Sequence, residues 1–149
     1  MRPSRLARPD VETEEFLVEA LSLVVGKSHP HARKRGPMAL RDFERESLVL
    51  LNEEFATRHY IDRYCRQHGV APRIAIEVNS ISAVVEIVRR GRLATLLPDA
   101  IARENNALYA VKLEPALPQR TAALLQRKGA YRSAAARAFV ELARHTSKA

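Results

Sequence analysis

Residues 74–98 show the clearest pattern of hydrophobic and polar positions in the chain. Apolar residues first recur at every second position, which predicts a strand, and then at the spacing of an amphipathic helix packed on a sheet. The strand positions are Ile74, Ile76 and Val78, and the helix positions are Ile81, Val84, Val85 and Val88. Gly91 is a good helix terminator, and a second buried strand is predicted at residues 93–97. The segment is therefore predicted to be a strand-helix-strand crossover.

Capping residues predict where two helices begin. Asn79 and Ser80 directly precede the helix of this crossover, and Thr57 is predicted to cap an earlier helix that follows a buried parallel strand at residues 47–52. In open α/β sheets, ligands bind at the carboxyl ends of strands, where helix N-termini present free N–H groups. Capping alone explains these residues equally well. The further hypothesis is that they converge on a site for a small anion.

The rest of the chain continues the alternation of strands and helices. Residues 1–10 are given no fold, the acidic lead at residues 11–15 is predicted to be solvated, and a strand is favoured over a helix for residues 16–25. The other predicted elements are an exposed loop at 28–37, a helical turn at 38–43, a helix ending at Gly69, a helix at 98–104, strands at 108–113 and 120–126, and a helix capped by Ser133. This order indicates the α/β class, with a mostly parallel sheet covered on both faces.

Composition narrows the class of protein. The 149 residues, 46% hydrophobic and 28% charged, suit one globular domain in the cytoplasm, and no apolar run approaches the roughly 18 residues of a membrane span. The single cysteine, Cys65, allows no internal disulfide. The net charge of +8 permits contact with polyanions, but Lys and Arg are scattered rather than gathered into a stripe. Charge alone therefore does not indicate nucleic-acid binding.

Motifs for catalysis, metals and cofactors are missing from the sequence. It contains no nucleophile elbow, no phosphate-binding glycine loop, no dinucleotide fingerprint and no HExxH pair, so we expect neither an enzyme nor a cofactor. Cys65 lies on the inward stripe of its predicted helix and is read as a packed hydrophobe. With the exception of the pair at His29 and His31, the histidines are far from one another in the sequence, so no metal site is expected.

Two residues near the predicted cap at Thr57 have more than one interpretation. Arg58 is unfavourable for the dipole at a helix start, so it serves a ligand or a carboxylate partner unless it is an ordinary solvated arginine, which is the commoner case. Phe55, in a polar loop, is either a cleft wall or a loop anchor. The sequence leaves these alternatives open.

The order of several motifs resembles the effector-binding domain of LysR-type transcriptional regulators. The motifs are LSLVV at residues 21–25, SLVLL at 47–51, FATRHYIDRYC at 55–65, EVNSISAVVEIVRRG at 77–91, LATLLP at 93–98 and QRTAALLQRKG at 119–129. Within the family, the segments at residues 52–65 and 77–90 are especially similar to the cyanate-responsive activators. The resemblance covers roughly residues 17–143.

The resemblance implies a fold and a site. Family members have a periplasmic-binding-protein-like (type II) effector domain with two α/β lobes and an effector between them. By resemblance, residues 1–24 are a lead-in segment and crossing strand, residues 25–119 are a complete second lobe, and residues 120–149 return to a partial first lobe. The effector-contacting residues implied are Asn52, Phe55, Thr57, Asn79, Ser80 and Thr95, with Arg58 as a further candidate.

The resemblance also implies partners. The effector is expected to be a small molecule, for example a small anion such as cyanate or azide, and full-length relatives are expected to form homo-oligomers. Their DNA contact uses a helix-turn-helix that precedes the effector domain and is absent from this sequence. The primary hypothesis is thus a truncated regulator that senses an effector without its DNA reader. The alternative is a free-standing protein that binds small anions or solutes.

Overall fold

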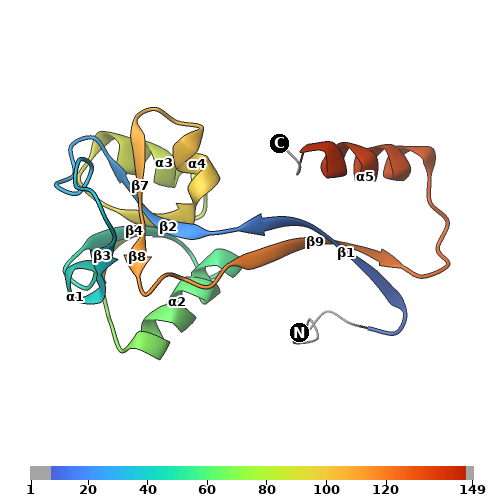
Figure 1. Cartoon of the computed structure of the whole chain (residues 1–149), viewed down its shortest axis with the longest axis horizontal. Coiled ribbons are helices and arrows are strands. Elements are labelled where there is room, and N and C mark those ends of the chain that lie inside the picture. Colours follow the sequence, from blue (N-terminus) through green and yellow to red (C-terminus); the bar gives the residue numbers. More distant parts are fainter. Residues whose placement is uncertain (1–7, 147–149) are drawn as a thin grey trace. The chain divides into compact units, whose positions relative to one another are not determined.

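The computed structural model describes residues 8–146, which form two compact units. The larger unit contains residues 20–118, and the smaller contains the described residues before 20 and after 118 (Figure 1). Their assignment to the lobes of a two-lobe domain stays a prediction. Among the described residues, no helix is long and apolar enough to cross a membrane.

The larger unit alternates strands and helices, which confirms the predicted α/β class. Its strands are β2 (Leu21–Gly26), β3 (Met38–Ala39), β4 (Ser47–Leu51), β5 (Arg73–Val78), β6 (Thr95–Pro98), β7 (Leu108–Val111) and β8 (Leu113–Glu114). Its helices are α1 (Leu40–Phe43), α2 (Ala56–His68), α3 (Ile81–Arg90) and α4 (Asp99–Arg103). The central β2 pairs antiparallel with β6 and β7, whereas β3 with β8 and β4 with β5 are parallel. The sheets are therefore mixed rather than mostly parallel as predicted, because the strand that enters this unit runs opposite to its neighbours β6 and β7. A parallel bridge between Leu48 and Ala94 joins the β4–β5 pair to the chain just before β6.

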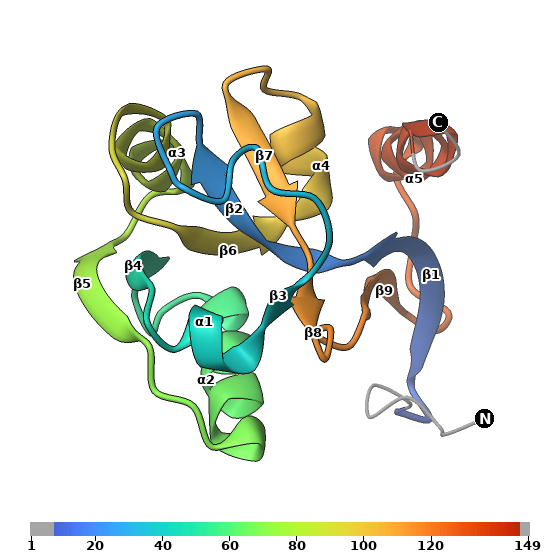
Figure 2. The ribbon, with the colours of Figure 1, turned by 60° about the vertical axis from the view of Figure 1, so that its left-hand side comes forward.

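Alternating side chains of the buried strands build a core on each face of these strands. On one face Leu48 and Leu50 pack in a cluster with Ile61 and Tyr64 of α2, and on the other Val49 and Leu51 pack with α3. Figure 2 shows α1 and α2 on one side of the strands and α3 and α4 on the other. Both faces of β4 are buried because helices cover both, which explains its continuous run of apolar residues.

The strand β5 departs from the predicted simple alternation. In its register with β4, Leu48 is opposite Ile74 but Val49 is opposite Ile76, so Ala75 is an extra residue, as in a β-bulge. Ile74 therefore lines a pocket with Leu50 and α2, whereas Val78 packs in the cluster on the α3 side. The prediction that Ile74, Ile76 and Val78 share one face is wrong, because one inserted residue reverses the side on which the following residues point.

The smaller unit is a two-stranded antiparallel ribbon with one helix. Its elements are β1 (Val11–Glu19), β9 (Arg120–Arg127) and α5 (Ala134–Thr146), which begins after the predicted cap Ser133. The acidic lead at residues 11–15, predicted to be solvated, is mostly exposed, and it forms the first half of β1. The single strand predicted over residues 16–25 is likewise divided at Ala20. Pairing with β9 and ion pairs to arginines explain why an acidic segment is extended here.

Gly26, at the end of β2, allows a close approach of α3. A Cβ atom at this position would lie 2.3 Å from the carbonyl oxygen of Val88. The loop that follows is exposed at Arg33, Lys34 and Arg35, as predicted, but His29 within it is buried. The loop is therefore anchored to the rest of the unit by His29, which is hydrogen-bonded to Glu46, and by Ala32, which packs in a core cluster.

Candidate functional site

Two helices begin beside each other at the carboxyl ends of the parallel strands β4 and β5. The backbone N–H of Asn52, the first residue after β4, donates to the carbonyl oxygen of Val78 at 2.8 Å, which ties the two strand ends together. Asn52 also holds the turn into α2, because its Oδ1 accepts from the N–H of Glu54 at 3.2 Å. The turns that precede α2 and α3 are thus neighbours, and we call residues 52–57 and 79–82 the strand-end edge.

The helix starts at this edge differ in how they are capped. Ser80 is the N-cap of α3, and its Oγ accepts from the N–H of Ala83 at 3.4 Å. Asn79, just before it, is exposed. The prediction that Thr57 caps α2 is wrong, because α2 begins at Ala56 and Phe55 is the N-cap residue, without a side-chain cap. Thr57 is half-buried inside the first turn.

Phe55 is a half-buried anchor of the turn before α2. Its side chain packs against the hydrophobic cluster that contains Val49, Leu51 and Val84. This contact supports the interpretation of Phe55 as a loop anchor. Packing fixes the direction in which the chain enters α2, and so the direction in which the first N–H groups of that helix point.

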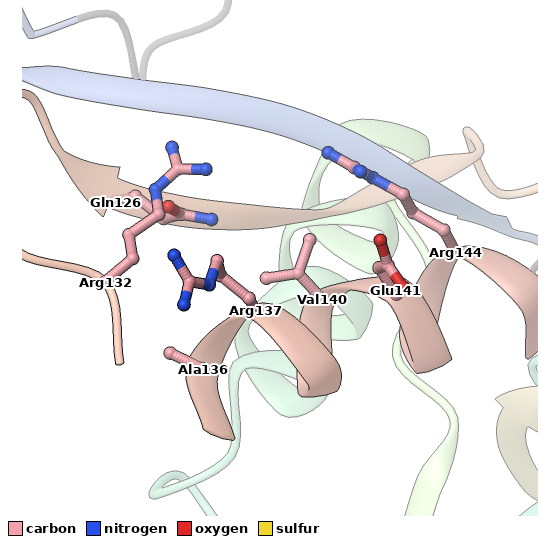
Figure 3. Close-up of a pocket in the computed structure, with 7 residues that line it drawn as sticks. All are labelled: Gln126, Arg132, Ala136, Arg137, Val140, Glu141 and Arg144. Carbon is pink, nitrogen blue, oxygen red and sulfur yellow. The ribbon is translucent and has the colours of Figure 1, made fainter. Parts of the chain in front are cut away.

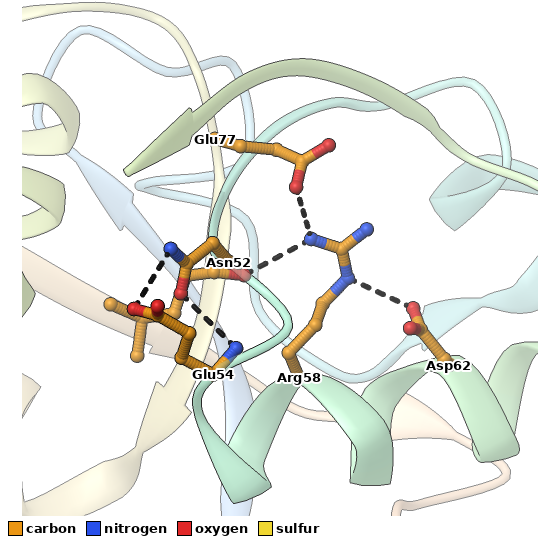
Figure 4. Close-up of polar contacts among 6 residues, drawn as sticks. Asn52, Glu54, Arg58, Asp62 and Glu77 are labelled. Atoms are coloured by element: carbon orange, nitrogen blue, oxygen red, sulfur yellow. Dashed lines mark hydrogen bonds and ion pairs between the residues drawn. The ribbon is translucent and has the colours of Figure 1, made fainter. Parts of the chain in front are cut away.

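Arg58 is buried, and its Nε and Nη1 atoms are hydrogen-bonded to protein groups (Figure 4). Its Nε donates to Asp62 at 3.0 Å, and its Nη1 donates both to the carbonyl oxygen of Leu51 at 3.0 Å and to Glu77 at 2.9 Å. The commoner reading of a solvated surface arginine is therefore wrong, and the carboxylate-partner alternative describes the structure. The partners Glu77 and Asp62 were missed by sequence reasoning, although Asp62 stands at the i+4 spacing that could have suggested it.

Opposing effects set the pKa of Arg58. Burial lowers the pKa of the guanidinium, but hydrogen bonds and charges from Glu77 and Asp62 outweigh burial and hold the pKa above its ordinary value. Arg58 thus stays charged, and its charge is already balanced by two carboxylates. It is not an open cation at the strand-end edge.

Thr95 is the most deeply buried of the predicted site residues. It is 1% exposed at the start of β6 and opposite Val24 of β2, within the sheet rather than at the strand ends. The nearby end of β6 instead brings Asp99, whose buried Oδ1 has no hydrogen-bond partner among the described residues. Sequence reasoning did not single out Asp99, and an acidic residue right after Pro98 was the only signal for it.

Further titratable side chains lie outside the strand-end edge. His29 and His31 both face Glu46, with Nε2 of His29 at 2.8 Å from its carboxylate, and burial and the charge of Lys34 lower the pKa of His31. Burial raises the pKa of the Cys65 thiol, as expected for a packed cysteine. Within residues 8–146, no group of three or more His, Cys, Asp or Glu residues suits a metal ion.

A separate pocket of about 180 Å³ lies in the smaller unit between β9 and α5 (Figure 3). Its lining residues are Gln126, Arg132, Ala136, Arg137, Val140, Glu141 and Arg144. Two of the arginines are already paired with β1, Arg132 with Glu12 and Arg144 with Glu14, each at 2.7 Å. This pocket was not predicted from the sequence, because its residues come from elements whose packing no motif predicts.

Comparisons with known proteins place the chain in a family. The LysR substrate binding domain family matches residues 1–148. The chain is 28% identical to the transcriptional dual regulator GltC of Bacillus subtilis over 89% of its length, and 25% identical to a probable RuBisCO transcriptional regulator of Phaeodactylum tricornutum over 86%. It spans 44% and 43% of these two proteins, less than half of each. They are regulators, in agreement with the prediction that the chain is not an enzyme.

Solved structures show the same fold. The regulatory domain of CcmR from Synechocystis PCC6803 superposes with a TM-score of 0.80 at 17% identity, over 99% of this chain and 71% of that one. The C-terminal domain of a probable LysR family regulator from Rhodococcus sp. RHA1 gives 0.71 at 27% identity, over 95% of this chain and 70% of that one. The fold is thus that of the type II, periplasmic-binding-protein-like effector domains. The chain belongs to the LysR family, and it matches that family through the substrate-binding domain.

Proposed function

We propose that this chain senses a small-molecule effector for a LysR-type transcriptional regulator and that the effector binds at the strand-end edge. The observation that carries the proposal is the paired start of α2 and α3 after the parallel strands β4 and β5. Neither helix has an acidic residue in its first turn, so nothing within the helices themselves neutralises their positive ends. This arrangement favours an anionic group on the effector.

The identity of the effector is the finer part of the proposal. The resemblance to cyanate-responsive activators suggests cyanate, with azide as a linear analogue, and both are small enough for two converging helix ends. The neighbours bind other molecules, since CcmR was solved with 2-PG and QuiR with shikimate. A panel containing all four compounds is therefore the appropriate first screen.

The experiment is a titration of the ¹⁵N-labelled chain, followed by backbone amide shifts. We expect the first and largest changes at Asn52, Asn79 and Ser80. Ser80→Ala should weaken binding, whereas Ser133→Ala, which removes the matching cap hydroxyl of α5, should leave binding unchanged. Shifts confined to Arg33, Lys34 and Arg35 would instead indicate unspecific attraction to a basic loop.

DNA recognition is proposed to lie outside these residues. The family match over residues 1–148 is entirely to a ligand-binding domain, so we expect the chain alone to lack sequence-specific DNA binding and to show only weak, salt-sensitive attraction. Fluorescence anisotropy with a promoter duplex and a scrambled duplex tests this. A preference for the promoter that survives raised salt would contradict it. The regulators matched act on genes, so we also propose a cytoplasmic location, and homo-oligomers for the full-length protein.

A further inference from the structure

The three contacts of Arg58 are not equivalent. The carbonyl oxygen of Leu51 belongs to the backbone at the end of β4, and Asp62 stands one turn along the same helix as Arg58. Both are held in place by regular secondary structure. Glu77 comes from the neighbouring strand β5 and reaches Arg58 with a long side chain that is 49% exposed, whereas the Arg58 side chain is 7% exposed. Glu77 is therefore the contact that can leave most easily.

Glu77 resembles a carboxylate ligand that binds Arg58 from the solvent, because its side chain is half-exposed while that of Arg58 is buried. Its departure would return a half-exposed carboxylate to water, which costs little, but would leave the buried guanidinium with only one carboxylate partner. A buried arginine in that state attracts any small anion that can accept a hydrogen bond from Nη1. The position lies directly below the strand-end edge, since Arg58 bonds the carbonyl oxygen of Leu51, the residue before Asn52.

We propose that a small anion, such as a carboxylate group, azide or cyanate, binds to Arg58 by displacing Glu77. This inference rests on the proposed function and adds a residue and a mechanism to it. Displacement also breaks the ion pair between Arg58 of α2 and Glu77 of β5, so anion binding weakens the contact between this helix and this strand. Glu77 is then a built-in competitor that weakens the affinity of the site for anions.

The test compares Glu77→Gln and Glu77→Ala with the unaltered chain, using sodium formate and sodium azide as probes. Removing the competitor should strengthen binding about tenfold if the pair is open about a tenth of the time, because apparent affinity scales with the competent fraction. The Nε–Hε signal of Arg58 should move with the probe in both variants. Formate should also restore thermal stability that Glu77→Ala loses, which a merely damaged fold would not show.

Glu86→Ala is the matched control. Glu86 is also 49% exposed and pairs with arginines, but its partners Arg89 and Arg90 are 37% and 75% exposed. Those arginines are already solvated, so their loss of Glu86 should create no anion site. Arg58→Lys keeps the charge but not the planar guanidinium fork. Combined with Glu77→Gln, it should therefore reduce the gain in anion binding that Glu77→Gln shows alone.

The outcomes separate this inference from the proposed function. If Glu77→Gln and Glu77→Ala show no saturable probe binding, or no gain over the unaltered chain, the displacement of Glu77 is overturned. If an effector still moves Asn79 and Ser80 in that case, the proposed function stands without it. If the Glu77 variants bind formate at Arg58 while no compound moves the helix starts, the proposed effector site falls and the anion position at Arg58 remains.

Discussion

The two compact units contain similar fractions of hydrophobic residues but bury them very differently. Every buried side chain in the described part of the chain lies between Leu21 and Leu117, inside the larger unit. In the smaller unit α5 buries no residue, and Phe139 and Leu142 are 62% and 66% exposed. The larger unit has helices on both faces of its strands, whereas a two-stranded ribbon with one helix has no second layer to bury against.

Ion pairs take the place of a core in the smaller unit. Glu12, Glu14 and Glu19 of β1 pair with Arg132, Arg144 and Arg120. Exposed pairs of this kind contribute little to stability, because water and salt screen the charges. An amphipathic pattern therefore shows which face of an element is apolar, but it does not show whether the chain supplies the surface that covers this face.

Truncation of two phenylalanines, one in each unit, should change stability by very different amounts, and this is the largest difference that we predict. Phe43 is fully buried, so Phe43→Ala should lower the free energy of unfolding by about 3–5 kcal/mol. Phe139→Ala, at an exposed position of α5, should change it by no more than about 0.5 kcal/mol. Urea unfolding followed by far-UV circular dichroism measures both. Equal losses would show that α5 packs within this chain after all.

A second, smaller effect is expected where β2 meets α3. Gly26→Ala would bring a Cβ within 2.3 Å of the Val88 carbonyl oxygen, so we expect a loss of about 1–3 kcal/mol from forced backbone movement. Gly91→Ala is the control, because its nearest contact, the carbonyl oxygen of Ile87, is at 3.0 Å. Thermal melting should rank Gly26→Ala well below Gly91→Ala in stability.

Much of the larger unit could be predicted because its signals are local. The crossover at residues 73–98, the cap Ser80 and the terminator Gly69 all follow from period and capping chemistry, and the structure confirms them. The extra residue at Ala75 was missed, since a bulge depends on pairing with β4 rather than on the strand itself. The acidic half of β1 was missed for the same reason, because its partners are arginines more than 100 residues away in sequence.

The candidate site was predictable only in outline. The ends of the parallel strands and the helix caps indicated the region of Asn52, Asn79 and Ser80. No local pattern showed that Arg58 is buried or that it pairs with Glu77 of strand β5. Thr57 was wrongly predicted to be the N-cap of α2, because the sequence does not distinguish a threonine that caps a helix from one that lies in its first turn. The roles of these residues in effector binding stay predictions.

A third effect concerns solubility more than unfolding. Phe139→Glu replaces an exposed aromatic residue of α5. Leu142 of the same helix and Tyr131, which precedes the helix, are also exposed. Exposed apolar surface promotes self-association, so this variant should sediment more nearly as a monomer than the unaltered chain, with an almost unchanged melting temperature. Sedimentation velocity at several concentrations measures this. A large drop in melting temperature would mean that the Phe139 face already has a partner within the chain.

The smallest effect is a pH dependence restricted to the smaller unit. The hydrogen bond and charge of Arg144 hold the pKa of Glu14 below its ordinary value. A carboxylate with a lowered pKa stabilises the folded state fully above the unfolded pKa, about 4.3, and this contribution is lost as the pH falls through the lower folded pKa. Amide exchange of α5 should therefore speed up relative to α2 as the pH is lowered through that window, after correction for the intrinsic exchange rate. Glu14→Gln should remove the pH dependence, and Glu141→Gln should retain it. An α5 that responds to pH no more than α2 would show that the Glu14–Arg144 pair does not hold the helix to the ribbon.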